Sequence, residues 1–98
     1  MKKTIDLVVT RHQGLVDYLI EEGLIEPETR IVDHASEEDI TGKHVLGVLP
    51  HNLSCLCNSF TEIPLLLPTE MRGKELSKED VRKYAGELVT YKVTRINK

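Results

Sequence analysis

The first apolar run of the chain stops abruptly at a charged turn. The run extends from Ile5 to Val9, and Thr10 and the sequence Arg-His-Gln-Gly of residues 11–14 follow it directly. A β-rich apolar segment of this kind predicts a buried parallel strand, and the apolar residues that resume at Leu15 predict a helix that packs back on it. Ligands of open α/β sheets bind beyond the carboxyl ends of the strands, where helix N-termini offer backbone N–H groups to anions. The turn at residues 10–14 is therefore a candidate binding site.

Further strand and helix patterns predict a small α/β domain. Strands are expected at residues 5–9, 29–34, 44–49 and 60–67, with a short final strand within 91–96, and helices at 14–22, 52–58 and 77–88, with a very short one from Ser36. Pro64 lacks a ladder donor, which places the fourth strand at an edge or delays its start to Leu65. The final segment could also extend the preceding helix, but we favour the strand. This order predicts a small Rossmann-like, mostly parallel sheet of four to five strands with helices on both faces, in one domain over residues 1–98.

The same patterns assign several side chains to the core or to a helix end. Ile31 and Val32 are expected to be buried in the second strand, and Cys57 is expected to be a core residue. Ser77 lies three residues before Asp80 and is expected to cap the last helix.

The composition argues against several classes of protein. A net charge of −3, from 13 basic and 16 acidic residues, argues against a duplex DNA or RNA binder with a broad basic face, although a few cations in a cleft can still bind a small anion. No apolar run approaches the length of a membrane span and no signal peptide is evident, so we expect a cytoplasmic protein with reduced cysteines and no membrane partner. A chain of 98 residues buries only roughly two-thirds of its unfolded surface, and dimerisation would stabilise it.

Three polar segments follow predicted strands and are expected to share one rim of the sheet: residues 10–14, 50–52 and 68–74. Arg11 and Arg72 offer planar forks of donors that suit phosphate oxygens, and Gly73 lets the backbone approach a ligand. The imidazole group of His12 is suited to proton transfer near neutral pH. The alternative is that both arginines are solvated loop residues.

The remaining histidines and the cysteines give weaker signals. His51 could face the same rim or simply start a helix in solvent, and we expect structural roles for His34 and His44. His51 and Cys55 share a helical face, but Cys57 points away from it, and a structural zinc ion requires four ligands. We therefore expect no metal and no other cofactor.

Several short sequences, taken together, resemble one protein family. They are Val-Val-Thr-Arg-His-Gln-Gly at residues 8–14 with Tyr18-Leu19, Gly-Val-Leu-Pro at 47–50 with Leu53, Leu67-Pro68, and Arg-Gly-Lys-Glu-Leu-Ser at 72–77. In this order, and over most of the chain, they are similar to the small CRISPR-associated ancillary proteins of type III systems, whose Rossmann-like fold is related to CARF sensor domains. The resemblance implies a ring nuclease: a homodimer that binds and linearises cyclic oligoadenylate, with cyclic tetra-adenylate as the expected substrate, and so switches off an antiviral signal.

Such a reaction needs no metal, because each 2′-hydroxyl group of the ring lies beside its own 3′-phosphate. We expect Arg11 to stabilise the charge of the transition state and His12 to act as general base or general acid. The expected ligand-binding residues are Thr10, Gly14, Pro50, His51, Asn52, Arg72 and Gly73.

Three other functions stay open on the sequence alone. The same arginines and glycines would serve a non-catalytic sponge or sensor that only sequesters the ring, and a dimeric scaffold would bind no nucleotide at all. A histidine phosphatase also ends its first strand in an Arg-His-Gly motif. Here Gln13 separates His12 from Gly14, and the chain is shorter than such enzymes need.

Overall fold

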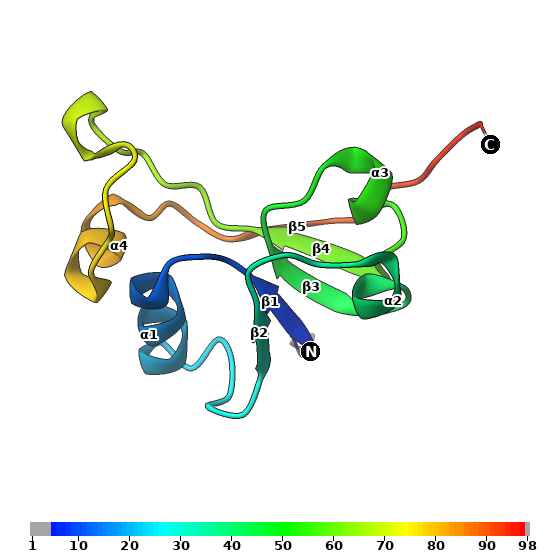
Figure 1. The fold of residues 1–98 in the computed structure, drawn as a ribbon, viewed down its shortest axis with the longest axis horizontal. Helices are drawn as coiled ribbons and strands as arrows, with labels where there is room; N and C mark the ends of the chain where they lie inside the picture. The colour runs from blue at the N-terminus through cyan, green and yellow to red at the C-terminus, as the bar shows by residue number, and fades with distance from the viewer. Residues whose placement is uncertain (1–4, 98) are drawn as a thin grey trace.

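Five short strands form one sheet in the computed structural model of the protein, which describes residues 5–97 (Figure 1). The strands are β1 (Leu7–Val9), β2 (Arg30–Val32), β3 (His44–Gly47), β4 (Ser59–Glu62) and β5 (Val89–Tyr91). Their order across the sheet is β2-β1-β3-β4-β5; the first four are parallel, and β5 runs antiparallel to β4. The predicted small, mostly parallel Rossmann-like sheet is thus confirmed.

Helices cover both faces of this sheet. They are α1 (Gln13–Glu21), α2 (Glu37–Ile40), α3 (His51–Ser54) and α4 (Lys78–Tyr84), with a 3-10 helix, η1 (Thr69–Met71), before α4. Figure 1 shows α1 and α4 side by side at one end of the molecule, and these two helices pack together. α2 and α3 contact each other over the opposite face.

The alternation of side chains along β1 divides the core into two layers. Val8 joins the layer formed with α1 and α4, and Leu7 and Val9 join the layer formed with α2 and α3. The other buried members of the first layer are Leu15, Val16, Leu19, Ile25, Leu46, Ile63, Leu76 and Val81. The second layer also holds Cys57, which confirms its predicted core position. Burial on both faces explains why the sequence of β1 is continuously apolar.

β2 is less buried than its apolar sequence predicts. Ile31 is 38% exposed and Val32 is only half-buried, so the prediction that both are core residues is wrong. The reason is the position of the strand, because β2 lies at the edge of the sheet and has a neighbouring strand, β1, on one side only. An apolar run therefore identified the strand correctly but not its place in the sheet.

The position of Pro64 also differs from the prediction. β4 ends at Glu62, before the proline, and lies between β3 and β5, so neither an edge position nor a start at Leu65 is correct. The carbonyl oxygen of Pro64 accepts a hydrogen bond from the N–H of Gly86 at 2.7 Å. Pro64 therefore sits outside the ladder, where its missing donor has no consequence.

The last helix and the last strand both end earlier than predicted. The N–H of Leu66 donates to the carbonyl oxygen of Tyr84 at 2.9 Å, and Leu65 and Ala85 form an isolated bridge. Because of this pairing, the helix ends at Tyr84 instead of at residue 88. The final strand is consequently Val89–Tyr91 and not a segment within 91–96, and α3 likewise ends at Ser54 rather than at residue 58.

Capping boxes begin α2 and α4. The hydroxyl of Ser77 accepts a hydrogen bond from the N–H of Asp80 at 3.1 Å, and the Asp80 carboxylate accepts one from the N–H of Ser77 at 3.0 Å. Ser36 and Asp39 repeat this arrangement at α2, and the hydrogen bond from the Ser36 backbone lowers the pKa of Asp39 below its usual value. The predicted cap at Ser77 is confirmed.

Two glycines let backbone segments come closer than a side chain would permit. A Cβ atom on Gly14 would lie 2.1 Å from the carbonyl oxygen of Leu76, so α1 rests directly on the segment that leads into α4. A Cβ atom on Gly47 would lie 2.2 Å from the carbonyl oxygen of Val9, and Gly47 has a φ of +147°. β3 ends at this glycine rather than at residue 49.

We expect the substitution Gly14→Ala to lower the free energy of unfolding by about 1–3 kcal/mol, because the added methyl group would push α1 away from Leu76. Urea unfolding followed by circular dichroism measures this change. Gln13→Ala is the matched control, since Gln13 is exposed at the same end of the helix and should change stability by less than about 0.5 kcal/mol. Equal stability of Gly14→Ala and the parent protein would contradict the close packing.

Candidate functional site

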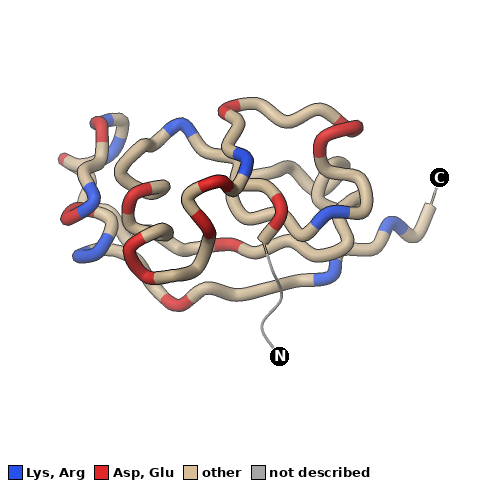
Figure 2. Tube along the Cα trace, turned by 90° about the horizontal axis from the view of Figure 1, so that it is seen from below, with Lys and Arg blue, Asp and Glu red and all other residues tan. Residues whose placement is uncertain are grey.

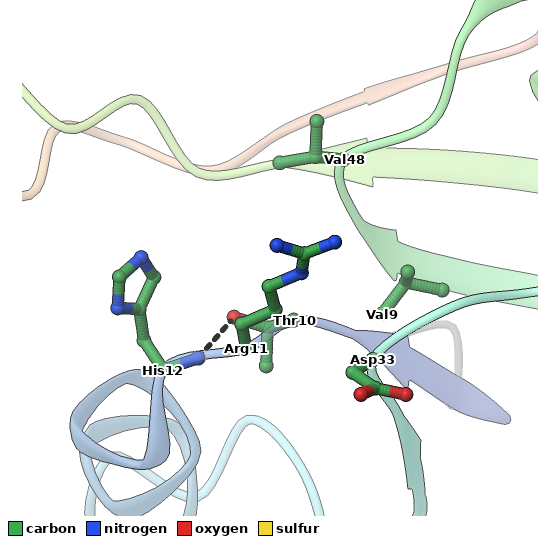
Figure 3. Close-up of a pocket in the computed structure, with 6 residues that line it drawn as sticks. All are labelled: Val9, Thr10, Arg11, His12, Asp33 and Val48. Atoms are coloured by element: carbon green, nitrogen blue, oxygen red, sulfur yellow. Dashed lines mark hydrogen bonds between the residues drawn. The ribbon is translucent and has the colours of Figure 1, made fainter. Parts of the chain in front are cut away.

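The candidate site is a cavity of about 300 Å³ at the carboxyl ends of three neighbouring parallel strands. Its lining residues are Val9, Thr10, Arg11, His12, Asp33 and Val48 (Figure 3). Thr10 to His12 follow β1, Asp33 follows β2, and Val48 follows β3. The first turn predicted from the sequence therefore forms the centre of the cavity, and its neighbours come from the two strands that flank β1.

The turn after β1 is held by its own hydrogen bonds. The N–H of His12 donates to the hydroxyl of Thr10 at 3.1 Å, and the carbonyl oxygen of His12 accepts from the N–H of Leu15 at 3.1 Å. His12 occupies the N-cap position of α1 in an extended conformation, and no side chain caps this helix. Figure 3 shows the side chains of Arg11 and His12 on the same side of the turn, pointing toward Val48.

Arg11 reaches across to the loop that follows β2. Its Nη2 atom lies 3.1 Å from Nε2 of His34, and because a guanidinium group can only donate, the imidazole must accept at Nε2 and carry its hydrogen on Nδ1. The sequence predicts only a structural role for His34. The contact orients the guanidinium of Arg11 at the cavity.

His12 carries an unusual nitrogen. Its side chain is half-buried, and Nδ1 is shielded from solvent without a hydrogen-bond partner among residues 5–97. A buried polar atom without a partner costs about 1–3 kcal/mol, and such atoms are found where a site stores strain or awaits a ligand. The imidazole therefore lies beside Arg11 with its Nδ1 atom unpaired within the described part of the chain.

Asp33 and His34 are site residues that the sequence patterns did not identify. Both follow β2, and β2 pairs with β1 in parallel register through Val9 and Val32. The loops that follow β1 and β2 must therefore meet at the same rim of the sheet. The rule that places the loops after the first, third and fourth strands at this rim holds equally for the loop after the second strand, which carries both residues.

The structure does not bring Pro50, His51 and Asn52 to this cavity. Pro50 is the N-cap of α3, and the chain after Gly47 crosses to the face that α3 covers. His51 and Asn52 instead line a cavity of about 310 Å³ together with Cys55 and the segment 93–95. Of the loop after β3, Val48 lines the Arg11 cavity, and this residue is 84% exposed.

Arg72 and Gly73 also lie apart from Arg11. They follow η1, which Figure 1 shows at the same end of the molecule as α4, and neither lines the Arg11 cavity. Gly73 closes the turn with a φ of +80°. The segment nevertheless connects to the first motif, because Leu76 packs on Gly14. Gly14 therefore packs on Leu76, and the phosphate contact expected from the sequence stays a prediction.

Charges of both signs are interspersed along the described chain, as Figure 2 shows. On α1 and α4 they form exposed ion pairs: Lys78 lies 2.7 Å from Glu21, and Arg82 contacts Glu21 and lies 3.0 Å from Glu22. Arg11, in contrast, forms no ion pair with any residue of 5–97, so its charge is available to an anion. No helix in that range is long and apolar enough to cross a membrane.

The two cysteines lie in different environments. Cys57 is buried and its thiol donates to the carbonyl oxygen of Leu53, whereas Cys55 is half-buried and donates to Asn52. Burial raises the pKa of the Cys57 thiol, and the neighbouring Cys55 raises it further. Within residues 5–97, no three histidine, cysteine or acidic side chains gather as a metal site would require.

A mostly parallel sheet with a charged cavity at the carboxyl ends of β1, β2 and β3 defines a small Rossmann-like protein with the kind of site at which α/β sheets bind ligands. The sequence profile of the family described as "Putative CRISPR-associated protein (Cas_VVA1548)" matches residues 7–94, and the chain belongs to this family. The expectation of a CRISPR-associated protein is confirmed at this level. No curated protein and no solved structure matches the chain.

We expect iodoacetamide to alkylate Cys55 in the folded protein while Cys57 reacts only after unfolding. Burial keeps Cys57 away from the reagent, and its raised pKa leaves the thiol neutral to higher pH, so less of the reactive thiolate forms. Mass spectrometry of peptides labelled with and without urea measures both sites. Equal labelling rates in the folded protein would contradict the packing of Cys57.

Proposed function

We propose that this CRISPR-associated protein is a metal-independent ring nuclease that binds and linearises cyclic oligoadenylate, with cyclic tetra-adenylate as its substrate. The observation that carries the proposal is the pair of Arg11 and His12, a fixed cation and a titratable imidazole side by side in one cavity at the rim of the sheet. Family membership supports the CRISPR setting of this activity. We infer that the enzyme works in the cytoplasm and lowers the level of an antiviral signal.

The residues of the cavity can supply the chemistry that the reaction needs. In the ring, each 2′-hydroxyl group lies beside a 3′-phosphate, so cleavage requires in-line geometry, stabilisation of charge and transfer of protons. The guanidinium of Arg11 presents several donors to phosphate oxygens and already points into the cavity. His12 is the adjacent group that can move a proton.

A dimer fits both the size of the cavity and the symmetry of the substrate. Ligand pockets typically measure about 300–1,000 Å³, so a cavity of about 300 Å³ holds only part of a four-nucleotide ring. A two-fold axis through the ring would present equivalent phosphates to two copies of Arg11 and His12. In this arrangement Arg72 and Gly73, which do not reach the cavity of their own chain, could contact the ring from outside it.

The proposal is tested by incubating the protein with cyclic tri-, tetra- and hexa-adenylate in the presence of a chelator and separating the products by chromatography. Conversion of the tetramer to linear products with 2′,3′-cyclic phosphate ends is the expected result. Tight binding without cleavage would replace the nuclease with a non-catalytic sponge. Absence of binding, or cleavage that requires added zinc or manganese, would contradict the proposal.

We expect His12→Ala to slow single-turnover cleavage of cyclic tetra-adenylate by roughly 10²–10⁴ while changing affinity little, because the imidazole acts mainly on proton transfer. Arg11→Ala should reduce both rate and affinity, since the guanidinium contacts phosphate before and during the reaction. Arg72→Ala should weaken affinity for cyclic tetra-adenylate more than it slows the cleavage step. Lys43→Ala is the control, because Lys43 is an exposed cation that precedes β3, at the end of that strand away from the site. Unchanged cleavage by His12→Ala would exclude His12 from proton transfer.

We further expect a homodimer at micromolar concentration, measured by multi-angle light scattering. Dimerisation would complete the ring site and would cover exposed apolar groups such as Val48 at its edge. A monomer both with and without cyclic tetra-adenylate would contradict this arrangement.

A further inference from the structure

Asp33 places a negative charge in a site that has the features of an anion-binding cavity. The residue follows β2 directly and lines the cavity together with Arg11 and His12. Its side chain is exposed, and its carboxylate has no hydrogen-bond or ion-pair partner among residues 5–97. Arg11, the arginine that lines the same cavity, donates to His34 instead. The carboxylate is therefore free to accept hydrogen bonds from a ligand.

The ligand must supply donors to this carboxylate, because a phosphate oxygen placed against it would be repelled. In a 3′,5′-linked cyclic oligoadenylate, the phosphodiester bonds occupy every 3′- and 5′-oxygen. The remaining donors are the 2′-hydroxyl groups and the amino groups of the adenine bases. The 2′-hydroxyl lies next to the phosphate, whereas the amino group lies at the far edge of the base.

The position of Asp33 selects between these donors. β2 is the immediate neighbour of β1, so Asp33 lies one strand away from the turn where Arg11 and His12 would hold the phosphate. An acidic residue at the end of the second strand of a Rossmann sheet is in the right place to bind a ribose hydroxyl while the phosphate sits at the first turn. We infer that Asp33 binds the ribose 2′-hydroxyl group and accepts its proton during cleavage, an inference that rests on the proposed ring nuclease activity.

This assignment divides the two proton transfers between two residues. As the bond between the 2′-oxygen and phosphorus forms, the 2′-proton passes to the carboxylate of Asp33. The bond between phosphorus and the 5′-oxygen breaks, its electron pair stays on the 5′-oxygen, and that oxygen takes a proton from the imidazolium form of His12. The product has a 2′,3′-cyclic phosphate at one end and a 5′-hydroxyl at the other, and Arg11 stabilises the phosphorane charge between the two steps.

Binding measurements test the contact without relying on turnover. On a His12→Ala background, where the ring outlasts the titration, cyclic tetra-adenylate should bind about ten-fold or more tightly than its all-2′-deoxy analogue, because a hydrogen bond to a charged acceptor is lost in the analogue. Adding Asp33→Ala should remove this preference and leave the two rings with nearly equal affinity. Persistence of the preference would overturn the assignment of Asp33, even if the ring nuclease activity is present.

Cleavage by Asp33→Asn tests the proton transfer. The amide oxygen can still accept from the hydroxyl group but is a poor base, so we expect affinity to stay within about three-fold and the single-turnover rate to fall roughly 10²–10⁴-fold. Glu38→Gln is the matched control, because it removes the same charge from an exposed residue that does not line the cavity, and it should leave both values unchanged. A parent rate in Asp33→Asn would overturn the proton transfer. Failure of the parent protein to bind either ring would overturn the proposed function and, with it, this inference.

Discussion

The direct contact of α1 with the segment that leads into α4 positions the candidate site. Gly14 makes this contact possible, because any side chain there would collide with the carbonyl oxygen of Leu76. Since Gly14 belongs to the first turn of α1, its packing fixes the start of the helix and, through it, the turn that carries Arg11 and His12. A small domain with five short strands has few other means of holding a loop, so backbone contact here replaces the larger core of a full-sized Rossmann domain.

The sequence predicted the fold well because the apolar runs of β1 and β3 are specific signals for strands buried on both faces. Strand order cannot be obtained in the same way. Ile31 has the same apolar character as Val8, yet it is exposed because β2 is an edge strand. The end of α4 could not be predicted from the sequence either, because it depends on the pairing of Leu65 with Ala85, which are distant in sequence.

Only part of the candidate site could be predicted, and the reason lies in the paths of the loops. The rule that loops meet at the carboxyl ends of parallel strands found Thr10, Arg11 and His12, but it says nothing about where a loop goes after its first residue. The loop after β3 leaves the rim after Val48 and crosses toward α3, which takes His51 to a different cavity. The segment after β4 continues past the rim to η1, which Figure 1 shows at the same end of the molecule as α4, and Arg72 follows η1 directly. The same rule, applied to the loop after β2, would also have found His34, whose side chain contacts Arg11.

The contact between Arg11 and His34 also bears on how the site can act on a ligand. If Arg11 paired with Asp33 instead, the two opposite charges would satisfy each other, and a phosphate would have to break that pair before it could bind. The neutral imidazole orients the guanidinium without cancelling its charge and leaves the carboxylate of Asp33 unpaired within residues 5–97. One cavity thereby presents a cation, which suits phosphate oxygens, and an anion, which suits hydroxyl groups. A ribose phosphate carries the complementary groups. This distribution of charge, more than the total charge of the protein, is what the proposed nucleotide ligand would require of the site.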